Sequence, residues 1–215
     1  MIISGIKENL QAIKASIPNN VTLVAVSKTK PNAAILEAYH AGQRIFGENK
    51  IQEMVNKYDD LPKDIQWHMI GHLQSNKVKY MAHFVDLIHG VDSFKTLKEI
   101  NKQAKKHHRI ISCLLQAKIA KEENKFGLSF ADIDSLISSD KLAELENINI
   151  VGLMGMATFT DNQNQLQEEF SSLKKFYNQQ KSTHQNFTTL SMGMSGDYQL
   201  AIKNGSTMVR VGSAI

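Results

Sequence analysis

Lys28 is the first residue whose position points to chemistry, because it directly follows the apolar run VAVS. Such a run is typical of a buried strand, and an ammonium at its end is costly unless it meets an anion or loses its proton. An unprotonated lysine amine is the nucleophile that forms Schiff bases with aldehydes. The alternative is a strand-end lysine whose ammonium simply reaches water, and position alone leaves both interpretations open.

A second candidate lies near the C-terminus, in the segment SMGMSGDYQLAIKNG. A predicted strand there runs into a turn that contains Gly193, Ser195 and Gly196, and Asp197 opens a short predicted helix. Free backbone N–H groups at such a turn, together with the Ser195 hydroxyl, can bind an anion such as phosphate. An ordinary strand-to-helix loop with a polar N-cap is the competing interpretation.

The last segment, MVRVGSAI, adds a cation and a second set of donors. Arg210 lies within an apolar strand, where a permanent cation needs a partner. Gly212 and Ser213 follow the strand and offer further backbone N–H groups. A lysine nucleophile, a phosphate-type turn and an inward arginine together favour pyridoxal 5′-phosphate as the ligand.

Two further segments carry weaker signals. FGENKIQE places Glu48 and Asn49 just after another strand, where Asn49 could donate to a ligand oxygen, although both residue types also start helices well. His68 and His72 are four residues apart in WHMIGHLQSNK. That segment is strand-like up to Gly71, so helical metal-binding geometry does not apply. We therefore expect no zinc site.

Short apolar runs alternate with longer amphipathic stretches along the chain. The candidate strands are 22–27, 44–46, 67–70, 84–91, 110–119, 148–156, 188–192 and 208–212. Helices are expected at 32–41, 48–58, 75–82, 93–107, 129–139, 162–183 and 197–204, with an extra helix at 2–16 before the first strand. This alternation predicts right-handed crossovers and a parallel sheet.

The length of the chain separates two kinds of parallel sheet. Eight units in 215 residues give roughly 27 residues each, near the lower size of an eight-fold barrel. A Rossmann sheet would carry G-x-G-x-x-G after an early strand, whereas the first strand here ends in SKTKP. We expect an α/β fold, a single (β/α)8 TIM barrel over residues 1–215 as one domain, in which residues 1–20 form the N-terminal helix.

The composition excludes several classes of protein. Apolar residues make up 42% of the chain and charged residues 21%, as in globular proteins with a sizeable core. The net charge of +4 is small and the cations are spread among acids, so we expect no nucleic-acid role. There is no signal-peptide pattern and no run of 18 apolar residues, and Cys113 lies in an apolar run typical of a buried, reduced thiol. We expect a cytoplasmic protein that does not enter membranes.

Five motifs recur together in one known family. They are LVAVSKTKP, IFGENKIQE, WHMIGHLQSNK, GLMGMAT and LSMGMSGDYQLAIKNGSTMVRVGSAI, and they run from about residue 20 to the end. As a set they resemble the pyridoxal phosphate homeostasis proteins, a family similar to the N-terminal barrel of alanine racemase. The resemblance implies a fold-type III pyridoxal-phosphate barrel with Lys28 as the cofactor-bound lysine.

The same resemblance implies the other cofactor contacts. They are Asn49 beside the ring, Met194 in the pocket wall, Arg210 at the pyridine nitrogen, and Ser195, Gly196, Gly212 and Ser213 at the phosphate. Lys125 and Gly127 match a weaker KxG element without an assigned role. The chain departs from the family at its C-terminus, where relatives continue past the last strand with a phenylalanine-glycine pair and a few polar residues.

The function implied by the resemblance is pyridoxal phosphate homeostasis, in which a monomer holds the cofactor as a Schiff base on Lys28, buffers it and delivers it to apo-enzymes. We expect little or no catalysis. Alanine racemase has a second domain that supplies a tyrosine as the second acid/base, which we do not expect here, and racemisation needs a proton donor and acceptor on opposite faces. The alternatives are an amino-acid racemase or lyase on the same barrel, and a module that binds a phosphate ligand without covalent chemistry.

Overall fold

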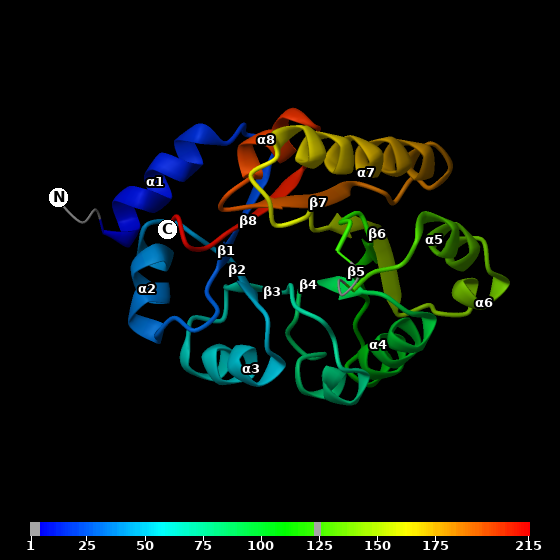
Figure 1. The fold of residues 1–215 in the computed structure, drawn as a ribbon. Coiled ribbons are helices and arrows are strands. Elements are labelled where there is room, and N and C mark those ends of the chain that lie inside the picture. Colours follow the sequence, from blue (N-terminus) through cyan, green and yellow to red (C-terminus); the bar gives the residue numbers. More distant parts are fainter. Residues whose placement is uncertain (1–4, 123–125) are drawn as a thin grey trace.

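The strands of the chain close into a parallel barrel (Figure 1). They are β1 (Thr22–Val26), β2 (Ile45–Glu48), β3 (Gln66–Met69), β4 (Leu87–Val91), β5 (Ile111–Ala117), β6 (Ile148–Gly155), β7 (Thr189–Met194) and β8 (Met208–Val211). The computed structural model describes residues 5–122 and 126–215. Within them each strand pairs with the next in chain order, and β8 returns to β1 with Thr22 opposite Met208. The predicted (β/α)8 TIM barrel is confirmed.

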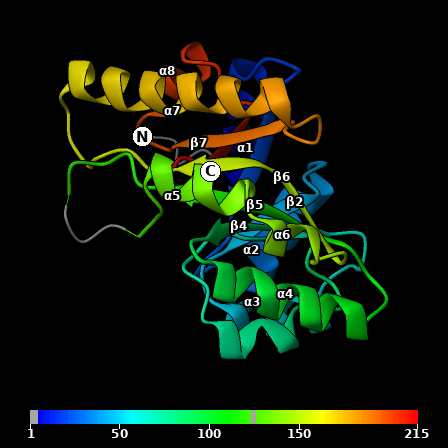
Figure 2. The same ribbon diagram turned by 90° about the vertical axis from the view of Figure 1, so that its right-hand side faces the viewer.

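Helices cover the outside of this barrel (Figure 1 and Figure 2). They are α1 (Ile6–Ser16), α2 (Asn32–His40), α3 (Ile51–Asp60), η1 (Ser75–Tyr80, a 3₁₀ helix), α4 (Phe94–Lys106), α5 (Phe130–Ile137), α6 (Asp140–Ala143), α7 (Gln163–Thr183) and α8 (Tyr198–Lys203). The helix α1 confirms the predicted N-terminal helix and buries Leu10 and Ile13, while residues 2–4 lie outside the described residues. The short α6 was not predicted. None of the helices in the described ranges combines the length and hydropathy needed to cross a membrane.

The apolar core has two parts, because the strands of a parallel barrel are covered on both faces. The larger part lies between the strands and the helices and contains Trp67, Phe170 and, as expected, a buried Cys113. Burial raises the pKa of that thiol. The smaller part gathers apolar side chains of β1, β4, β5, β6 and β8, namely Val24, Leu87, Leu114, Met154 and Met208. Buried polar side chains occupy further positions on the strands, and they matter for the site.

The boundary between β2 and α3 differs from the expectation. A helix was predicted over 48–58, but α3 begins at Ile51. Glu48 still belongs to β2, where it lies opposite Met69 of β3. The local sequence favours a helix start at Glu48, but the pairing of β2 with β3 holds this residue in the sheet.

A second difference lies before β4. The strand predicted over 84–91 begins only at Leu87, because the N–H of Val85 donates back to Met81 in a turn. The helix predicted over 75–82 is the 3₁₀ helix η1. The remaining predicted elements agree with the structure apart from small shifts at their ends.

Candidate functional site

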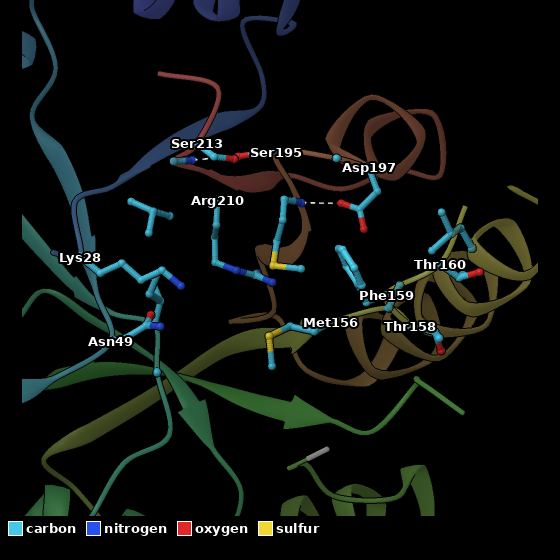
Figure 3. Close-up of a pocket in the computed structure, with 18 of the residues that line it drawn as sticks. Lys28, Asn49, Met156, Thr158, Phe159, Thr160, Ser195, Asp197, Arg210 and Ser213 are labelled. Carbon is cyan, nitrogen blue, oxygen red and sulfur yellow. Dashed lines mark hydrogen bonds between the residues drawn. The ribbon is translucent and has the colours of Figure 1, made fainter. Parts of the chain in front are cut away.

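A cavity of about 660 Å³ opens at the carboxyl ends of the strands. The barrel topology explains which residues meet there, because the strands of a parallel barrel all end at the same face. The wall of the cavity includes all of the residues that the sequence selected for a ligand (Figure 3): Lys28, Asn49, Met194, Ser195, Gly196, Arg210, Gly212 and Ser213.

Lys28 reaches the cavity from the segment that leaves β1 (Figure 3). Ser27 precedes it, is buried, and donates its N–H to Gly47 O over 3.0 Å, which continues the pairing of β1 with β2. Thr29 follows it with a φ of +62°, a conformation that β-branched residues rarely adopt. Within the described ranges the Nζ of Lys28 has no hydrogen bond or ion pair. Its amine is therefore available to a ligand.

Two turns that follow β7 and β8 offer a set of hydrogen-bond donors. The Oγ of Ser195 accepts the N–H of Gly212 over 3.1 Å, which ties the two turns together. A Cβ on Gly212 would lie 3.0 Å from Val26 Cβ, so this close approach favours glycine. The N–H groups of Gly196 and Ser213 have no acceptor in the described part of the chain. Unpartnered N–H groups in a cavity wall are suited to a phosphate.

The first of these turns leads into the short helix α8, with Asp197 at its N-cap as predicted. The helix α8 has only 6 residues, and Asp197 does not cap it with its side chain. Instead, the Asp197 carboxylate accepts the N–H of Met194 over 2.6 Å and fixes the turn (Figure 3). The unpartnered N–H of Gly196 therefore belongs to the turn before α8, as the sequence predicts.

Arg210 is the buried cation of the site. Its side chain is held by β7 and β6, with Nη1 donating to Ser191 Oγ over 2.5 Å and Nη2 donating to Gly155 O over 3.0 Å. Burial lowers its pKa to about 10, against an opposing effect of Asp197. The guanidinium therefore keeps its charge at neutral pH, and the prediction that this cation needs partners in an apolar strand is confirmed.

Two buried histidines extend the contacts of Arg210 across the barrel. Nδ1 of His89 lies 3.1 Å from Ser191 Oγ, and Nε2 of His89 lies 3.0 Å from Nδ1 of His68. Burial lowers the pKa of His68 to about 3, and burial together with the charges of His68 and Arg210 places the pKa of His89 well below its usual value. Both rings are therefore neutral at physiological pH.

This chain of contacts was not predicted from the sequence. His68 was considered only as a possible metal ligand, and His89 and Ser191 were not selected. The available signal was a polar residue inside each of the apolar runs FVDLIHGV and TTLSM, because a buried polar side chain needs a partner. In the described residues no three or more His, Cys, Asp or Glu side chains cluster in a way that could hold a metal ion.

Asn49 lies in the cavity wall as predicted (Figure 3), but its neighbour Glu48 does not. A Cβ on Gly71 would lie 2.8 Å from Asn49 Cα, so the segment that follows β3 can pack this closely on Asn49 only through glycine. Glu48 is completely buried, where its carboxylate accepts from Ser27 Oγ over 2.6 Å and from Lys57 Nζ over 2.7 Å. The prediction that Glu48 comes just after the strand was wrong, because β2 continues through it.

The far side of the cavity is built by residues that the sequence analysis did not select. Thr158, in the segment after β6, is fixed by Glu169 of α7, which accepts its N–H and its Oγ1–H over 2.7 Å each. Phe126 and Phe159 stand at the rim with 53% and 96% exposure. His72 stacks on Phe126 with ring centroids 4.0 Å apart. The only signal for these cavity residues in the sequence was that each follows a predicted strand.

Of the two residues of the weak KxG element, the structure describes only Gly127. Lys125 lies outside the described residues. Gly127 has a φ of +136°, and a Cβ on it would lie 2.7 Å from the N of Lys118. Glycine is therefore required there by the close approach to the end of β5, which is a role in packing.

The donor set fits a group that carries an aldehyde, a phosphate and an aromatic ring. Lys28 provides an amine, Gly196 and Ser213 provide N–H groups, and Arg210 provides a fixed cation in the wall. Apolar side chains that can flank a ring also line the cavity: Val26, Ile70, Met156 and Leu166. Pyridoxal 5′-phosphate combines these three features in one small molecule.

Comparison with known proteins also points to pyridoxal phosphate. The family model of the alanine racemase N-terminal domain matches residues 3–215. A pyridoxal phosphate homeostasis protein of Vibrio alginolyticus is 38% identical over 228 residues, which cover 99% of this chain and 97% of that relative. Another, from Escherichia coli, is 38% identical over 202 residues, which cover 92% of this chain and 86% of that relative.

Solved structures agree with these sequence matches. The structure of PipY from Synechococcus elongatus without PLP aligns with a TM-score of 0.90 at 38% identity, covering 97% of this chain and 98% of that chain. The structure of the same protein with PLP bound aligns with a TM-score of 0.87 at 36% identity. An alanine racemase of Clostridium difficile shares the fold with a TM-score of 0.82 at 14% identity, and the match covers 56% of that chain.

Proposed function

Because the chain belongs to the family of pyridoxal phosphate homeostasis proteins, we propose that it binds pyridoxal 5′-phosphate in the strand-end cavity and acts in the homeostasis of this cofactor. One observation carries the proposal. A lysine amine without a protein partner shares a single cavity with two turns that offer unpartnered N–H groups. Buffering and delivery of the cofactor require both groups, since the amine can retain an aldehyde reversibly and the turns can retain a phosphate.

The proposed roles follow from these contacts. Lys28 holds the aldehyde carbon covalently, and the N–H groups of Gly196 and Ser213 hold the phosphate together with the Ser195 hydroxyl. Gly212 acts through its lack of a side chain, because its N–H already donates to Ser195. Asn49 and Met194 flank the ring. When bound, the cofactor supplies a reactive aldehyde and a ring that can withdraw electrons.

We propose that Arg210 faces the ring nitrogen and that catalysis is weak or absent. A permanent cation disfavours protonation of a neighbouring nitrogen. Arg210 is held by Ser191 and the carbonyl of Gly155, and both are uncharged acceptors. Because neither acceptor carries a charge, the guanidinium stays a cation, a state that Asp197 further favours, and it reduces the electron-withdrawing power on which α-proton chemistry depends.

Delivery to recipient apo-enzymes, a monomeric state and a cytoplasmic location complete the proposal. Delivery is supported by access to the site, since Lys28 is exposed and Phe159 at the rim is 96% exposed. The loaded protein is mixed with an apo-enzyme that uses pyridoxal phosphate, and the recovery of enzyme activity is followed. Activity should return faster than it does with the amount of free cofactor that the loaded protein releases on dilution. Sedimentation of the purified protein should give the mass of one chain, 24.1 kDa.

The direct test is covalent labelling. The purified protein is titrated with pyridoxal 5′-phosphate, reduced with borohydride, digested and mapped by mass spectrometry. The label should appear on Lys28, and the variant Lys28→Ala should lose it while Lys30→Ala, a change in the nearest lysine, should keep it. A label carried mainly by another lysine would refute the assignment.

The phosphate turns are tested separately with pyridoxal, which lacks the phosphate. Each charge-assisted hydrogen bond contributes roughly 1.5–3 kcal/mol, so pyridoxal should bind at least about tenfold more weakly, or about 1.4 kcal/mol. The measurement is made in Lys28→Ala, so that covalent capture does not contribute. Equal affinities for the two compounds would contradict the proposed phosphate site.

A further inference from the structure

A buried ion cluster adjoins the turn that carries Lys28. It consists of Ser27, Glu48, Glu53 and Lys57, which we call the Lys57 cluster. The Nζ of Lys57 lies 2.7 Å from each of three acceptors, which are Ser27 O, Glu48 Oε1 and Glu53 Oε1. An ammonium has three N–H groups, so these contacts use all of them.

Lys57 is not a second amine for the ligand. Its side chain is only 7% exposed, and it does not contribute to the wall of the 660 Å³ cavity. With all three N–H groups donated to oxygen atoms, it has no lone pair to offer an aldehyde. A lysine this close to Lys28 in space therefore needs a different explanation.

The cluster holds the residues on both sides of Lys28. On one side, Ser27 donates its hydroxyl to Glu48 Oε1 over 2.6 Å. On the other side, the N–H of Thr29 donates to Glu53 Oε1 over 2.5 Å, and its Oγ1 donates to Lys28 O over 2.6 Å. The φ of +62° at Thr29 is unfavourable for a β-branched residue, so this turn needs contacts of this kind to persist.

The cluster also connects the turn to two rigid elements. Glu48 is the last residue of β2, while Glu53 and Lys57 lie one turn apart on α3. Burial raises the pKa of Glu48, against the opposing hydrogen bonds of Lys57 and Ser27. Burial also acts to raise the pKa of Glu53, but the hydrogen bonds from Lys57 and Thr29 outweigh it and lower that pKa. A buried ion pair is weak evidence for a gain in stability, so the position of these contacts around the turn is the feature that needs an explanation.

We propose that Lys57 is a positioning residue for Lys28, which it serves with Glu48 and Glu53 by fixing the turn that presents the Lys28 amine to the cavity. This inference rests on the proposed function. Capture joins Lys28 Nζ to the aldehyde carbon, and the aldehyde oxygen leaves as water with both hydrogens of the neutral amine. A turn that moves freely would place the amine correctly for only part of the time, so capture would slow while the phosphate turns, on β7 and β8, remain intact.

The test separates capture from non-covalent binding. The rate of covalent capture of pyridoxal 5′-phosphate is followed by absorbance and by borohydride trapping. The Kd of pyridoxine 5′-phosphate, which has no aldehyde, reports the phosphate turns alone. Lys57→Met should slow capture by about tenfold or more, with the Kd of pyridoxine 5′-phosphate changed by less than about twofold, and Lys57→Arg should recover part of the rate.

A second variant guards against loss of folding in Lys57→Met, which leaves buried carboxylates without their cation. Glu53→Ala removes the acceptor of the Thr29 N–H and one of the three acceptors of Lys57, on a side chain that is 24% exposed, and it keeps the buried pair of Lys57 with Glu48. It should slow capture in the same way. Lys14→Met is the matched control, because Lys14 donates to Gly42 O over 3.1 Å before β2, away from the cavity. It should capture at the wild-type rate.

The outcomes are distinct from those of the proposed function. If the unmodified protein fails to capture the aldehyde on Lys28, the proposed function itself is wrong. If it captures and both Lys57→Met and Glu53→Ala match its rate, the positioning role is refuted. The role would also be refuted if Lys57→Met and Glu53→Ala lost affinity for pyridoxine 5′-phosphate together with the rate of capture, or if Lys14→Met slowed capture equally. The Lys57 cluster would then only support the fold as a whole.

Discussion

Arg210 on β8 donates a 2.5 Å hydrogen bond from Nη1 to the Oγ of Ser191 on the neighbouring strand β7. A guanidinium only donates, so Ser191 accepts here and its own hydrogen can go to Nδ1 of His89, 3.1 Å away. The Nε2–H of His89 can then donate to Nδ1 of His68 over 3.0 Å. The cation at the site is thus held by a directional chain of neutral groups inside the barrel.

Replacing Ser191 by Ala should destabilise the fold. The change leaves one buried N–H of Arg210 and Nδ1 of His89 without a partner, and each unsatisfied buried group costs about 1–3 kcal/mol. Urea unfolding should show this loss in the free energy of unfolding. Ser182→Ala on an exposed part of α7 is the control, expected within about 0.5 kcal/mol of the unmodified protein, and equal effects of the two changes would contradict the chain.

The two buried histidines predict a loss of stability at acidic pH. The pKa of His68 is lowered to about 3 and that of His89 well below its usual value, in both cases chiefly by burial. An unfolded histidine titrates near 6.5, so between about pH 6.5 and 3 the unfolded chain binds protons that the folded chain does not. The free energy of unfolding should therefore fall as the pH drops, by up to about 1.4 kcal/mol per unit for each histidine.

This pH dependence is measured by urea unfolding at about pH 7.5, 6 and 5. His89→Gln retains polar atoms but cannot titrate in this range, so it should flatten the slope. His40→Gln, on an exposed surface of α2, should leave the slope unchanged. If the free energy of unfolding of His89→Gln falls with pH as steeply as that of the unmodified protein, other groups cause the acid sensitivity.

The sequence predicted the residues at the cavity wall but not the partners that hold them. Lys28 and Arg210 could be selected because a charged residue in or after an apolar strand is visible locally, and the barrel places strand ends together. The contact of His89 with Ser191 joins residues 102 positions apart, and no local pattern specifies such a pair. Glu48 was misplaced for the same reason, since pairing with β3 overrides its preference for a helix start.

Gly71→Ala should damage both folding and binding. The added Cβ would lie 2.8 Å from Asn49 Cα, and backbone cannot move aside as a flexible side chain can. Overpacking of this kind typically costs about 1–3 kcal/mol and should displace Asn49 from the cavity wall, which weakens cofactor binding. Gly196→Ala is the matched control for folding alone, because its Cβ would have no neighbour within 4 Å. Thermal unfolding should separate the two, and equal stabilities would contradict the proposed contact.

The charge of Arg210 predicts a protein that binds amino acids on its cofactor without transforming them quickly. The pKa of Arg210 is lowered by burial only to about 10, so at neutral pH its guanidinium remains a cation beside the proposed position of the ring nitrogen and opposes protonation there. The ring then withdraws electrons weakly, and α-hydrogen removal loses its main source of stabilisation. Incubation of the loaded protein with L-alanine in deuterated water should give α-hydrogen exchange and racemisation far slower than ordinary enzymatic turnover, roughly 1–10³ s⁻¹. Turnover within that range would overturn the homeostasis role and establish the protein as a racemase.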